Sequence, residues 1–268
     1  MSEVIELIQQ LAAVPSFSHQ EDRLHPLVRE LLAPIPGVQI EAVPTHNLVV
    51  TIPSASEQPP IALTAHLDKI DHYGTGTQTL DVSTREGKIV GPMDDSVGLG
   101  LCIALARAAT RYSFPPLLLL LSEQEECGGA GARNISAYLL NRGTLPAAVV
   151  TIDTTPLFRG QSGLAIYCAP WERSGHDASS ELRSSTSALR DEFLSLAPDI
   201  RVANNGNDYV TYGAELNPQG TAPTPSIALE PSIFPYHCQH EEVFTADVLR
   251  LEELLTKFLC NRAAGGSA

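Results

Sequence analysis

With 268 residues, the chain is long enough for one large domain or two small ones, and its 43% hydrophobic and 18% charged residues are typical of an ordinary globular protein. It carries 31 acidic against 17 basic residues, a net charge of −14 without a basic stripe, which argues against nucleic acid as a partner. The longest apolar stretch, residues 115–121, is too short to cross a bilayer, so we expect no membrane association.

Taken in chain order, hydrophobic periodicity and turn residues predict that helices alternate with strands. The expected helices cover residues 4–14, 21–32, 97–109, a stretch ending near 140, 186–196 and 246–259. The expected strands cover residues 38–43, 47–52, 61–66, 115–121, 147–152, 164–168, 200–203 and 226–229. This alternation predicts an α/β fold with three layers, α/β/α, around a mostly parallel mixed sheet. We expect one catalytic domain over residues 1–262 and a flexible tail over 263–268.

The cysteines and the N-terminus bear on the cellular setting. The five cysteines are scattered, odd in number and without CxxC spacing, which favours free thiols in a reduced protein. The first residues lack the basic and then apolar layout of a signal peptide. We therefore expect a cytoplasmic protein.

Several of the apolar runs end in acids or in a histidine. The run 61–65 leads into His66 and Asp68, and the run 147–152 stops at Asp153. The run 115–121 leads into Glu123, Glu125 and Glu126, and the run 226–229 leads through a Pro-rich turn to His237. Open α/β sheets place their active sites just past the carboxyl ends of parallel strands. The pattern predicts one polar cluster at that edge.

These residue types suit a hydrolytic site with two metal ions. Asp94, Glu126, Asp153 and one hydroxide would balance the four charges of two divalent ions, with His66 and His237 neutral. Such ions, ~3.5–4 Å apart, activate a water and polarise a carbonyl. Imidazole and carboxylate ligands are compatible with zinc, although cobalt or manganese would also fit. Asp68 is placed to orient the His66 ring, and Glu125 to move a proton from the attacking water to a leaving amine.

Five short motifs resemble, in the right order, those of the co-catalytic zinc exopeptidases. They are His66-Leu67-Asp68, Asp94-Asp95, Gln124 to Gly128, Ile152-Asp153, and His237 with Glu241. That clan includes aminopeptidases and carboxypeptidase-G-like enzymes. Residues 66–70 and 124–132 are most similar to its glutamyl-aminopeptidase and endoglucanase-like group. Residues 15–18 also resemble the start of the proteins in that group.

The resemblance implies a metal ligand set and two further roles. Asp94 would bridge two ions, and His66 and Asp153 would each hold metal beside it. His66 and Glu126 would lie on opposite ions, and His237 would share the ion of Glu126. Glu125 matches the clan's general acid and base, Asp68 its orienting aspartate, and the bond after the bridging aspartate is often cis.

The chain departs from its expected relatives in length. The glutamyl-aminopeptidase group carries a large inserted domain, used for assembly, between the positions of Asp68 and Asp94. Only 25 residues separate them here, so any oligomer would form without that domain. The interval from Asp153 to His237 is likewise too short for the dimerisation domain of the carboxypeptidase-like branch.

Two ligand positions have a neighbouring alternative. Asp95 competes with Asp94 as the bridge, although a role as helix N-cap suits one member of the pair. His240 competes with His237, and the interval from His237 to Glu241 favours His237. The remaining histidines are interpreted as surface residues, and Asp208 and Tyr209 as turn or pocket residues.

The expected function is a metal-dependent exopeptidase, an aminopeptidase in the first instance, acting on small peptides or amides. A deacylase or amidase acting on small N-acyl compounds is the alternative. A non-catalytic relative is disfavoured, because the ligands, the base and the orienting acid are all present.

Overall fold

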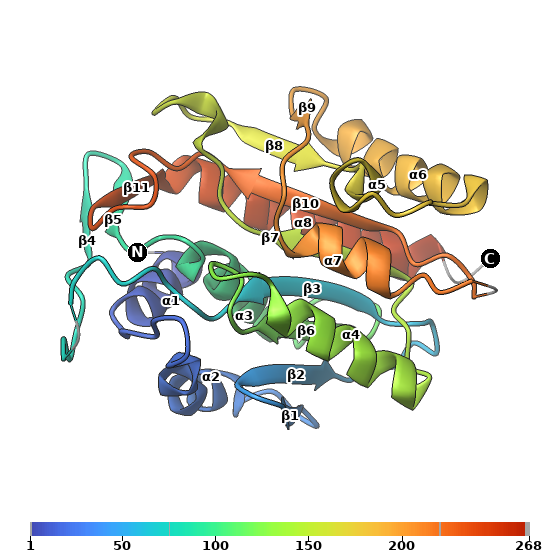
Figure 1. The fold of residues 1–268 in the computed structure, drawn as a ribbon, viewed down its shortest axis with the longest axis horizontal. Helices are drawn as coiled ribbons and strands as arrows, with labels where there is room; N and C mark the ends of the chain where they lie inside the picture. The colour runs from blue at the N-terminus through green and yellow to red at the C-terminus, as the bar shows by residue number, and fades with distance from the viewer. Residues whose placement is uncertain (1, 75, 220, 266–268) are drawn as a thin grey trace.

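The computed structural model describes residues 2–74, 76–219 and 221–265. An eight-stranded mixed sheet runs through its centre (Figure 1). In spatial order its strands are β1 (Gln39–Val43), β2 (Asn47–Ile52), β6 (Leu117–Ser122), β3 (Ile61–His66), β7 (Ala148–Ile152), β10 (Ser226–Pro231), β8 (Leu164–Tyr167) and β9 (Arg201–Ala203).

The middle of this sheet is parallel. Strand β3 pairs in parallel with β6 on one side and with β7 on the other, and β7 continues in parallel to β10. The antiparallel pairs join β1 to β2, β2 to β6, and β10 to β8. The four central strands β6, β3, β7 and β10 are buried along their whole length, which explains the apolar runs within them.

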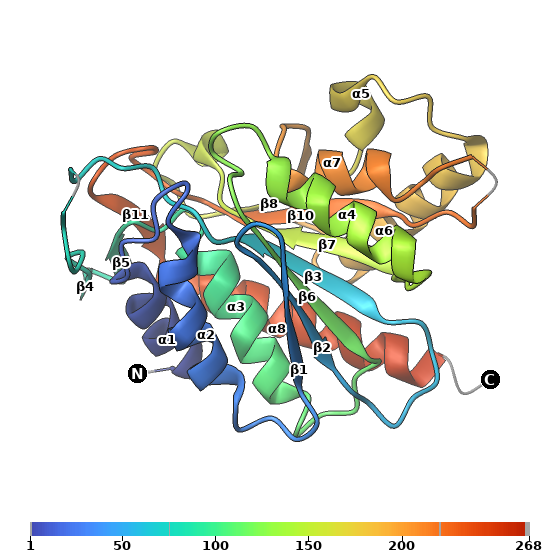
Figure 2. The same cartoon turned by 60° about the horizontal axis from the view of Figure 1, so that its bottom comes forward.

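Helices cover both faces of the sheet (Figure 2). On one face, residues of α1 (Glu3–Ala12), α2 (His25–Leu32), α3 (Ser96–Ala108), α6 (Ser180–Leu196) and α8 (Thr245–Gly265) join the largest apolar cluster. On the other face, α4 (Ala130–Arg142) and α7 (Asp208–Glu215) pack against the strands in a second cluster, with the short α5 (Pro170–Ser174) against α7. The predicted three-layer α/β/α fold is confirmed.

Successive residues of each strand point to opposite faces, and the two clusters divide them accordingly. In β6, Leu117, Leu119 and Leu121 belong to the larger cluster, whereas Leu118 and Leu120 belong to the smaller one. Both faces of the strand are therefore dry, and the polar groups at its end are positioned by a rigid core.

A second, three-stranded sheet was not predicted. It joins β4 (Ser83–Arg85), β5 (Lys88–Gly91) and β11 (Glu241–Phe244) in the order β11-β5-β4. These strands are short, and β11 is far from the other two in sequence, so local periodicity does not reveal the pairing. Strand β5 continues directly into the turn before α3, which carries Asp94, and β11 follows the loop that carries His237. The pairing of β5 with β11 therefore holds these two segments together.

Several element boundaries differ from the expected ones. Helix α6 begins at Ser180, six residues early, because the side chain of Ser179 caps it by accepting the N–H of Leu182. Residues 21–24 and 156–158 form single 3-10 turns. Helix α8 continues to Gly265, past the expected end of the domain at 262, and residues 266–268 of the expected tail lie outside the described residues.

Two further observations concern the cysteines and the helices. Cys102, Cys127, Cys168, Cys238 and Cys260 are all free thiols. Among the described helices, none combines the length and apolar character that a membrane span requires.

Candidate active site

Three central parallel strands and two loops supply the site. His66 ends β3, Asp153 directly follows β7, and the loop after β6 carries Glu125 and Glu126. Asp94 lies in the turn before α3, and His237 lies in the loop between β10 and β11. Parallel strands end at the same edge of the sheet, so residues separated by up to 171 positions (237 minus 66) meet there. All seven residues predicted for the site lie at this edge.

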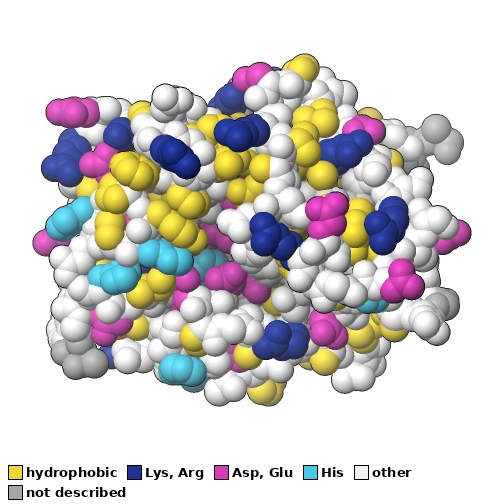
Figure 3. Space-filling model, turned by 45° about the horizontal axis from the view of Figure 1, so that its top comes forward, with side chains coloured by type: hydrophobic (Ala, Val, Ile, Leu, Met, Phe, Trp, Pro, Cys, Tyr) yellow, Lys and Arg dark blue, Asp and Glu magenta, His cyan; other side chains and the backbone are white. Residues whose placement is uncertain are grey.

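Figure 3 shows acidic and histidine side chains gathered together on this face, beside a patch of apolar surface. A cavity of about 170 Å³ opens among them, lined by Asp94, Glu125, Glu126, Asp153, Thr154, Asn205, Gly206, Asn207, Glu230, Tyr236 and His237. No lysine or arginine belongs to this lining.

The two oxygens of Asp94 face different histidines. Its Oδ1 lies 3.1 Å from Nε2 of His66, and its Oδ2 lies 3.5 Å from Nε2 of His237. On the first side, Asp153 Oδ1 lies 4.0 Å from the same His66 nitrogen. On the second side, Glu126 Oε2 lies 3.5 Å from the His237 nitrogen. One carboxylate therefore stands between two groups, each of one imidazole and one further carboxylate.

This donor set fits two divalent ions. Donors held ~2.0–2.2 Å from a tetrahedral ion lie roughly 3.3–3.6 Å from one another. The distances between 3.1 and 4.0 Å at His66 and His237 fall around that range. Donor atoms of His66, Asp94 and Glu126 also lie within 4.8 Å of one another. Nitrogen and carboxylate donors suit zinc, and also cobalt and manganese.

Asp95 makes different contacts from Asp94. Its Oδ1 accepts the backbone N–H of Gly98 at 2.7 Å and so caps α3, and its Oδ2 accepts the N–H of His66 at 3.3 Å. Donor atoms of Asp95, His66 and Asp153 lie within 4.8 Å of one another, so the residue is close to the site. Both of its oxygens are nevertheless engaged by backbone donors, as expected of a helix cap. The peptide bond between Asp94 and Asp95 is cis, as the resemblance implied.

Asp68 connects the His66 ring to the loop that carries Glu125. Its Oδ1 lies 3.3 Å from Nδ1 of His66 and accepts the N–H of Glu125 at 3.0 Å. Its Oδ2 accepts the N–H of Glu126 at 3.3 Å and the hydroxyl of Ser18 at 2.8 Å. Asp68 is fully buried, so a single rigid carboxylate orients the imidazole and the loop together.

The acids of the site repel one another, and burial adds to this effect. Burial, followed by the charge of Asp94, raises the pKa of Glu126 to about 7. Burial and the neighbouring carboxylates also raise the pKa of Asp153 and Glu125 well above their usual ranges. Asp94 behaves oppositely: burial opposes its ionisation, but His237 and His66 outweigh burial and lower its pKa.

The histidines respond to the same carboxylates. Burial opposes protonation of His66, but its contacts with Asp68 and Asp94 hold its pKa well above the usual value. The contact with Asp94 raises the pKa of His237, which is less buried. The site as a whole therefore favours positive charge, which is the condition for cation binding.

Glu230 and Asn207 belong to the site and were not predicted. Glu230 lies near the end of β10, is 2% exposed and lines the cavity. The side-chain amide of Asn207 donates to Glu230 Oε1 at 2.7 Å and to Asp153 Oδ2 at 2.8 Å. The signal for Glu230 was an acid at the end of the apolar run 226–229, the same signal that identified Asp153. Asn207 lies in a loop rich in Asn and Gly, and such residues are common in turns, so the sequence did not indicate a role for it in the site.

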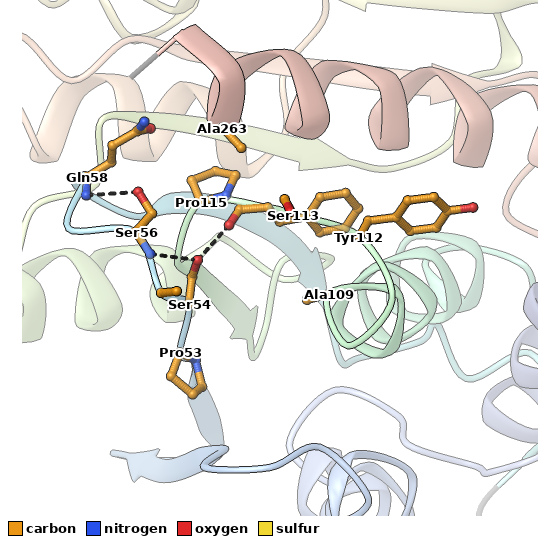
Figure 4. Close-up of a pocket in the computed structure, with 11 residues that line it drawn as sticks. Pro53, Ser54, Ser56, Gln58, Ala109, Tyr112, Ser113, Pro115 and Ala263 are labelled. Atoms are coloured by element: carbon orange, nitrogen blue, oxygen red, sulfur yellow. Dashed lines mark hydrogen bonds between the residues drawn. The ribbon is translucent and has the colours of Figure 1, made fainter. Parts of the chain in front are cut away.

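Two other features of the protein do not belong to the site. The carboxylate of Glu123 accepts the backbone N–H groups of Thr45 and His46, both at 2.8 Å, and anchors that turn instead. A larger hollow, about 650 Å³, lies between the end of β2 and the start of β6, opposite the carboxyl ends of the parallel strands (Figure 4). No aspartate, glutamate, histidine or cysteine lines that hollow, so it offers no comparable ligands.

The fold and this site define the class: a three-layer α/β/α protein with clustered histidine and carboxylate side chains, fit to hold metal ions, at the carboxyl edge of its sheet. Comparison with known proteins places the chain more narrowly. Residues 47–243 match the sequence profile of peptidase family M28, and the chain belongs to this family. The predicted clan and the predicted class of enzyme, a metallo-hydrolase of peptide bonds, are thereby confirmed.

Solved structures of other proteins share this fold. An aminopeptidase from the archaeon Desulfurococcus kamchatkensis superposes with a TM-score of 0.72 at 17% identity, over 96% of this chain and 94% of that one. The TET1 peptidase of Pyrococcus horikoshii superposes with a TM-score of 0.68 at 15% identity, over 96% and 99%. At these identities, the likeness concerns the fold.

One curated relative matches part of the chain. A succinyl-diaminopimelate desuccinylase from Wolinella succinogenes is 26% identical over 155 residues, which cover 57% of this chain and 42% of that protein. The chain therefore matches less than half the length of that relative, and the match does not carry an activity across.

Proposed function

We propose that the chain is an aminopeptidase that holds two divalent ions, zinc in the first instance, between His66 and Asp153 on one side and Glu126 and His237 on the other, with Asp94 shared. The observation that supports it most is the position of Asp94, whose two oxygens face one histidine each at 3.1 and 3.5 Å. When bound, such ions supply Lewis acidity that polarises a carbonyl and lowers the pKa of water.

The protein's own residues would prepare and complete the reaction. Asp68 holds His66 in one orientation and fixes the backbone at Glu125. Glu125 lines the cavity, and burial and the surrounding acids raise its pKa, which suits a carboxylate that accepts a proton and releases it near neutral pH. We assign it the transfer of a proton from the attacking water to the leaving amine.

The experiment is a substrate panel on the metal-loaded protein. Aminoacyl p-nitroanilides with a free α-amine are compared with N-acyl amino acids, whose deacylation is followed through the amine that it exposes, and metal is quantified by mass spectrometry. Hydrolysis of the free-amine series, abolished by a chelator and restored by zinc, is the expected result. Hydrolysis of the acylated series alone would overturn the aminopeptidase assignment.

The second candidate is a deacylase acting on small N-acyl compounds. It is favoured by the partial match to the desuccinylase from Wolinella succinogenes. The panel above separates the two candidates, because a deacylase cleaves an acyl group from an amine and has no need of a free α-amine.

Any assembly would use surfaces of the domain itself. The TET1 peptidase of Pyrococcus horikoshii can assemble into a tetrahedron or a large octahedral shell. In this chain, 25 residues separate Asp68 from Asp94, and part of that segment forms the short strands β4 and β5. We propose that an oligomer, if formed, does not depend on a separate inserted domain.

A further inference from the structure

The active-site cavity contains more carboxyl groups than the proposed metal centre uses. Five carboxylates line it, and neither lysine nor arginine is among the lining residues. Three of the five, Asp94, Glu126 and Asp153, are the proposed metal ligands, and Glu125 is the proposed proton carrier. Glu230 remains without a role in that chemistry.

Glu230 is held firmly in place. It is 2% exposed and lies in β10, one of the four buried parallel strands. Asn207 donates to its Oε1 at 2.7 Å and to Asp153 at 2.8 Å through the same amide nitrogen. The amide thereby fixes Glu230 at the edge of the metal centre, beside the Asp153 carboxylate.

No cation of the protein accompanies this carboxylate. In the part of the chain that the structure describes, Glu230 contacts Asn207 and Tyr167 but forms no ion pair with a lysine, arginine or histidine. Burial, followed by the charges of Asp153 and Asp94, raises the pKa of Glu230 well above its usual range, because no cation of the protein stabilises the ionised carboxylate. A cation that enters the cavity would supply that stabilisation.

Resting on the proposed function, we propose that Glu230 binds a primary ammonium group of the substrate inside the cavity and thereby selects substrates with a free amine. An ammonium offers three donors on a compact charge, which suits a carboxylate oxygen next to Asn207. The cavity of about 170 Å³ has room for a small group of this kind. An N-succinyl compound would bring additional negative charge toward Glu230 and is therefore disfavoured.

Two ammonium groups of a peptide fit this chemistry: the α-amine and the ω-amine of a lysine side chain. Both are tested with Glu230→Gln, which keeps the shape and removes the charge. Leucine p-nitroanilide presents the α-amine alone, whereas lysine p-nitroanilide presents both. Glu215→Gln is the matched control, since Glu215 is exposed on α7 and outside the cavity lining.

We expect Glu230→Gln to raise KM for the leucine substrate roughly 10- to 100-fold, with a smaller change in kcat and two ions still bound. A rise confined to the lysine substrate would assign Glu230 to the ω-amine. Glu230→Asp, which keeps the charge, should recover part of the lost affinity, whereas a merely structural role would not distinguish Asp from Gln in this way. Unchanged KM for both substrates overturns the proposal.

A binding measurement keeps this test independent of turnover. Leucinol, which carries the ammonium group but no hydrolysable bond, is titrated calorimetrically into the zinc-loaded wild type, Glu230→Gln and Glu215→Gln. Tighter binding to the wild type and to Glu215→Gln than to Glu230→Gln supports the ammonium site, even if the substrate panel identifies a deacylase. Equal binding to all three proteins, or no binding to any, overturns it, whatever reaction the enzyme catalyses.

Discussion

Glu241 Oε2 accepts the backbone N–H of Asp94 at 3.1 Å, although the two residues are 147 positions apart. The same oxygen accepts the N–H of Met93 at 2.8 Å, and Oε1 accepts the N–H of His237 at 2.9 Å. Glu241 is 4% exposed and begins β11, the strand that pairs with β5. A single buried carboxylate thus holds both segments that supply Asp94 and His237.

This relationship makes Glu241 a positioning residue. Glu241→Gln leaves one acceptor oxygen for three backbone donors, so Asp94 or His237 should lose its fixed position. We expect the affinity for one of the two ions to fall roughly 10- to 100-fold, the usual effect of losing a partner that orients a ligand. Competition with a chromogenic chelator measures the affinity of the variant for each ion. Glu242→Gln is the control, because the Glu242 side chain pairs with Lys88 instead; equal affinities in the two variants would contradict the prediction.

Replacing Glu125 should separate metal binding from turnover. Glu125→Gln keeps the size of the side chain but cannot accept a proton, so we expect kcat to fall by roughly 10²- to 10⁴-fold. Two ions per chain should remain, because Glu125 is not among the proposed ligands. Metal analysis and initial rates on the same preparation check both points, and full activity of this variant would show that another group moves the proton.

Asp94 and Asp95 should differ in what their loss affects. Asp94→Asn removes the shared charge, and we expect loss of metal and activity. Asp95→Ala removes the cap of α3 at Gly98, and we expect the free energy of unfolding to fall by about 1–2 kcal/mol, the typical value of an N-cap. Metal content and denaturant unfolding of both variants test the distinction. If Asp95→Ala lost the ions at saturating zinc and Asp94→Asn kept them, the assignment would be reversed.

The features that local patterns encode could be predicted from the sequence. Strands β3, β6 and β7 are rich in apolar residues because both of their faces are buried, and each strand leads into a segment that carries a residue of the site. Because parallel strands end at the same edge of a sheet, the sequence alone predicted that His66, Glu126 and Asp153 lie close together.

The features that depend on distant pairing could not be predicted in this way. Strand β11 forms only because Glu241 to Phe244 find β5 about 150 positions away, and four residues carry too little periodicity to reveal this. Asn207 acquires its place only when α7 packs on the sheet beside β10 and β7. The contacts of Glu241, Glu230 and Asn207 are of this kind, and they surround the predicted ligands.

The metal-free protein should lose stability as pH rises. Burial and Asp94 raise the pKa of Glu126 to about 7 and that of Glu241 to about 8, from the ordinary 4.5. Between the ordinary pKa of 4.5 and the raised pKa of each group, the folded chain binds more protons than the unfolded chain. The free energy of unfolding therefore falls with increasing pH in that interval. Burial lowers the pKa of Lys69 to about 7, so above that pH Lys69 makes the free energy of unfolding rise with pH and opposes the effect of the two acids. The comparison is therefore limited to the interval from about pH 5 to about pH 7.

Thermal unfolding of chelator-treated protein measures this effect. We expect a lower Tm near pH 7 than near pH 5, and a larger gain in Tm on adding zinc near pH 7, because the ions then displace fewer protons. A Tm of the metal-free protein that rises over this interval would contradict the assignment of Glu126 and Glu241 to one buried acidic cluster.

His237 and His240 provide a matched pair of exposed histidines in one loop. Nε2 of His237 lies 3.5 Å from both Asp94 and Glu126, and its ring stacks on Tyr236, with centroids 3.7 Å apart. His240 is not part of the cavity lining. We therefore expect His237→Ala to retain one tightly bound ion and to lose most of its activity, because Glu126 and Asp94 alone hold the second ion weakly. His240→Ala should keep two ions and near-normal kcat. If the two variants exchanged these properties in metal analysis and initial rates, His240 would be the ligand, and the loop would have to rearrange on metal binding.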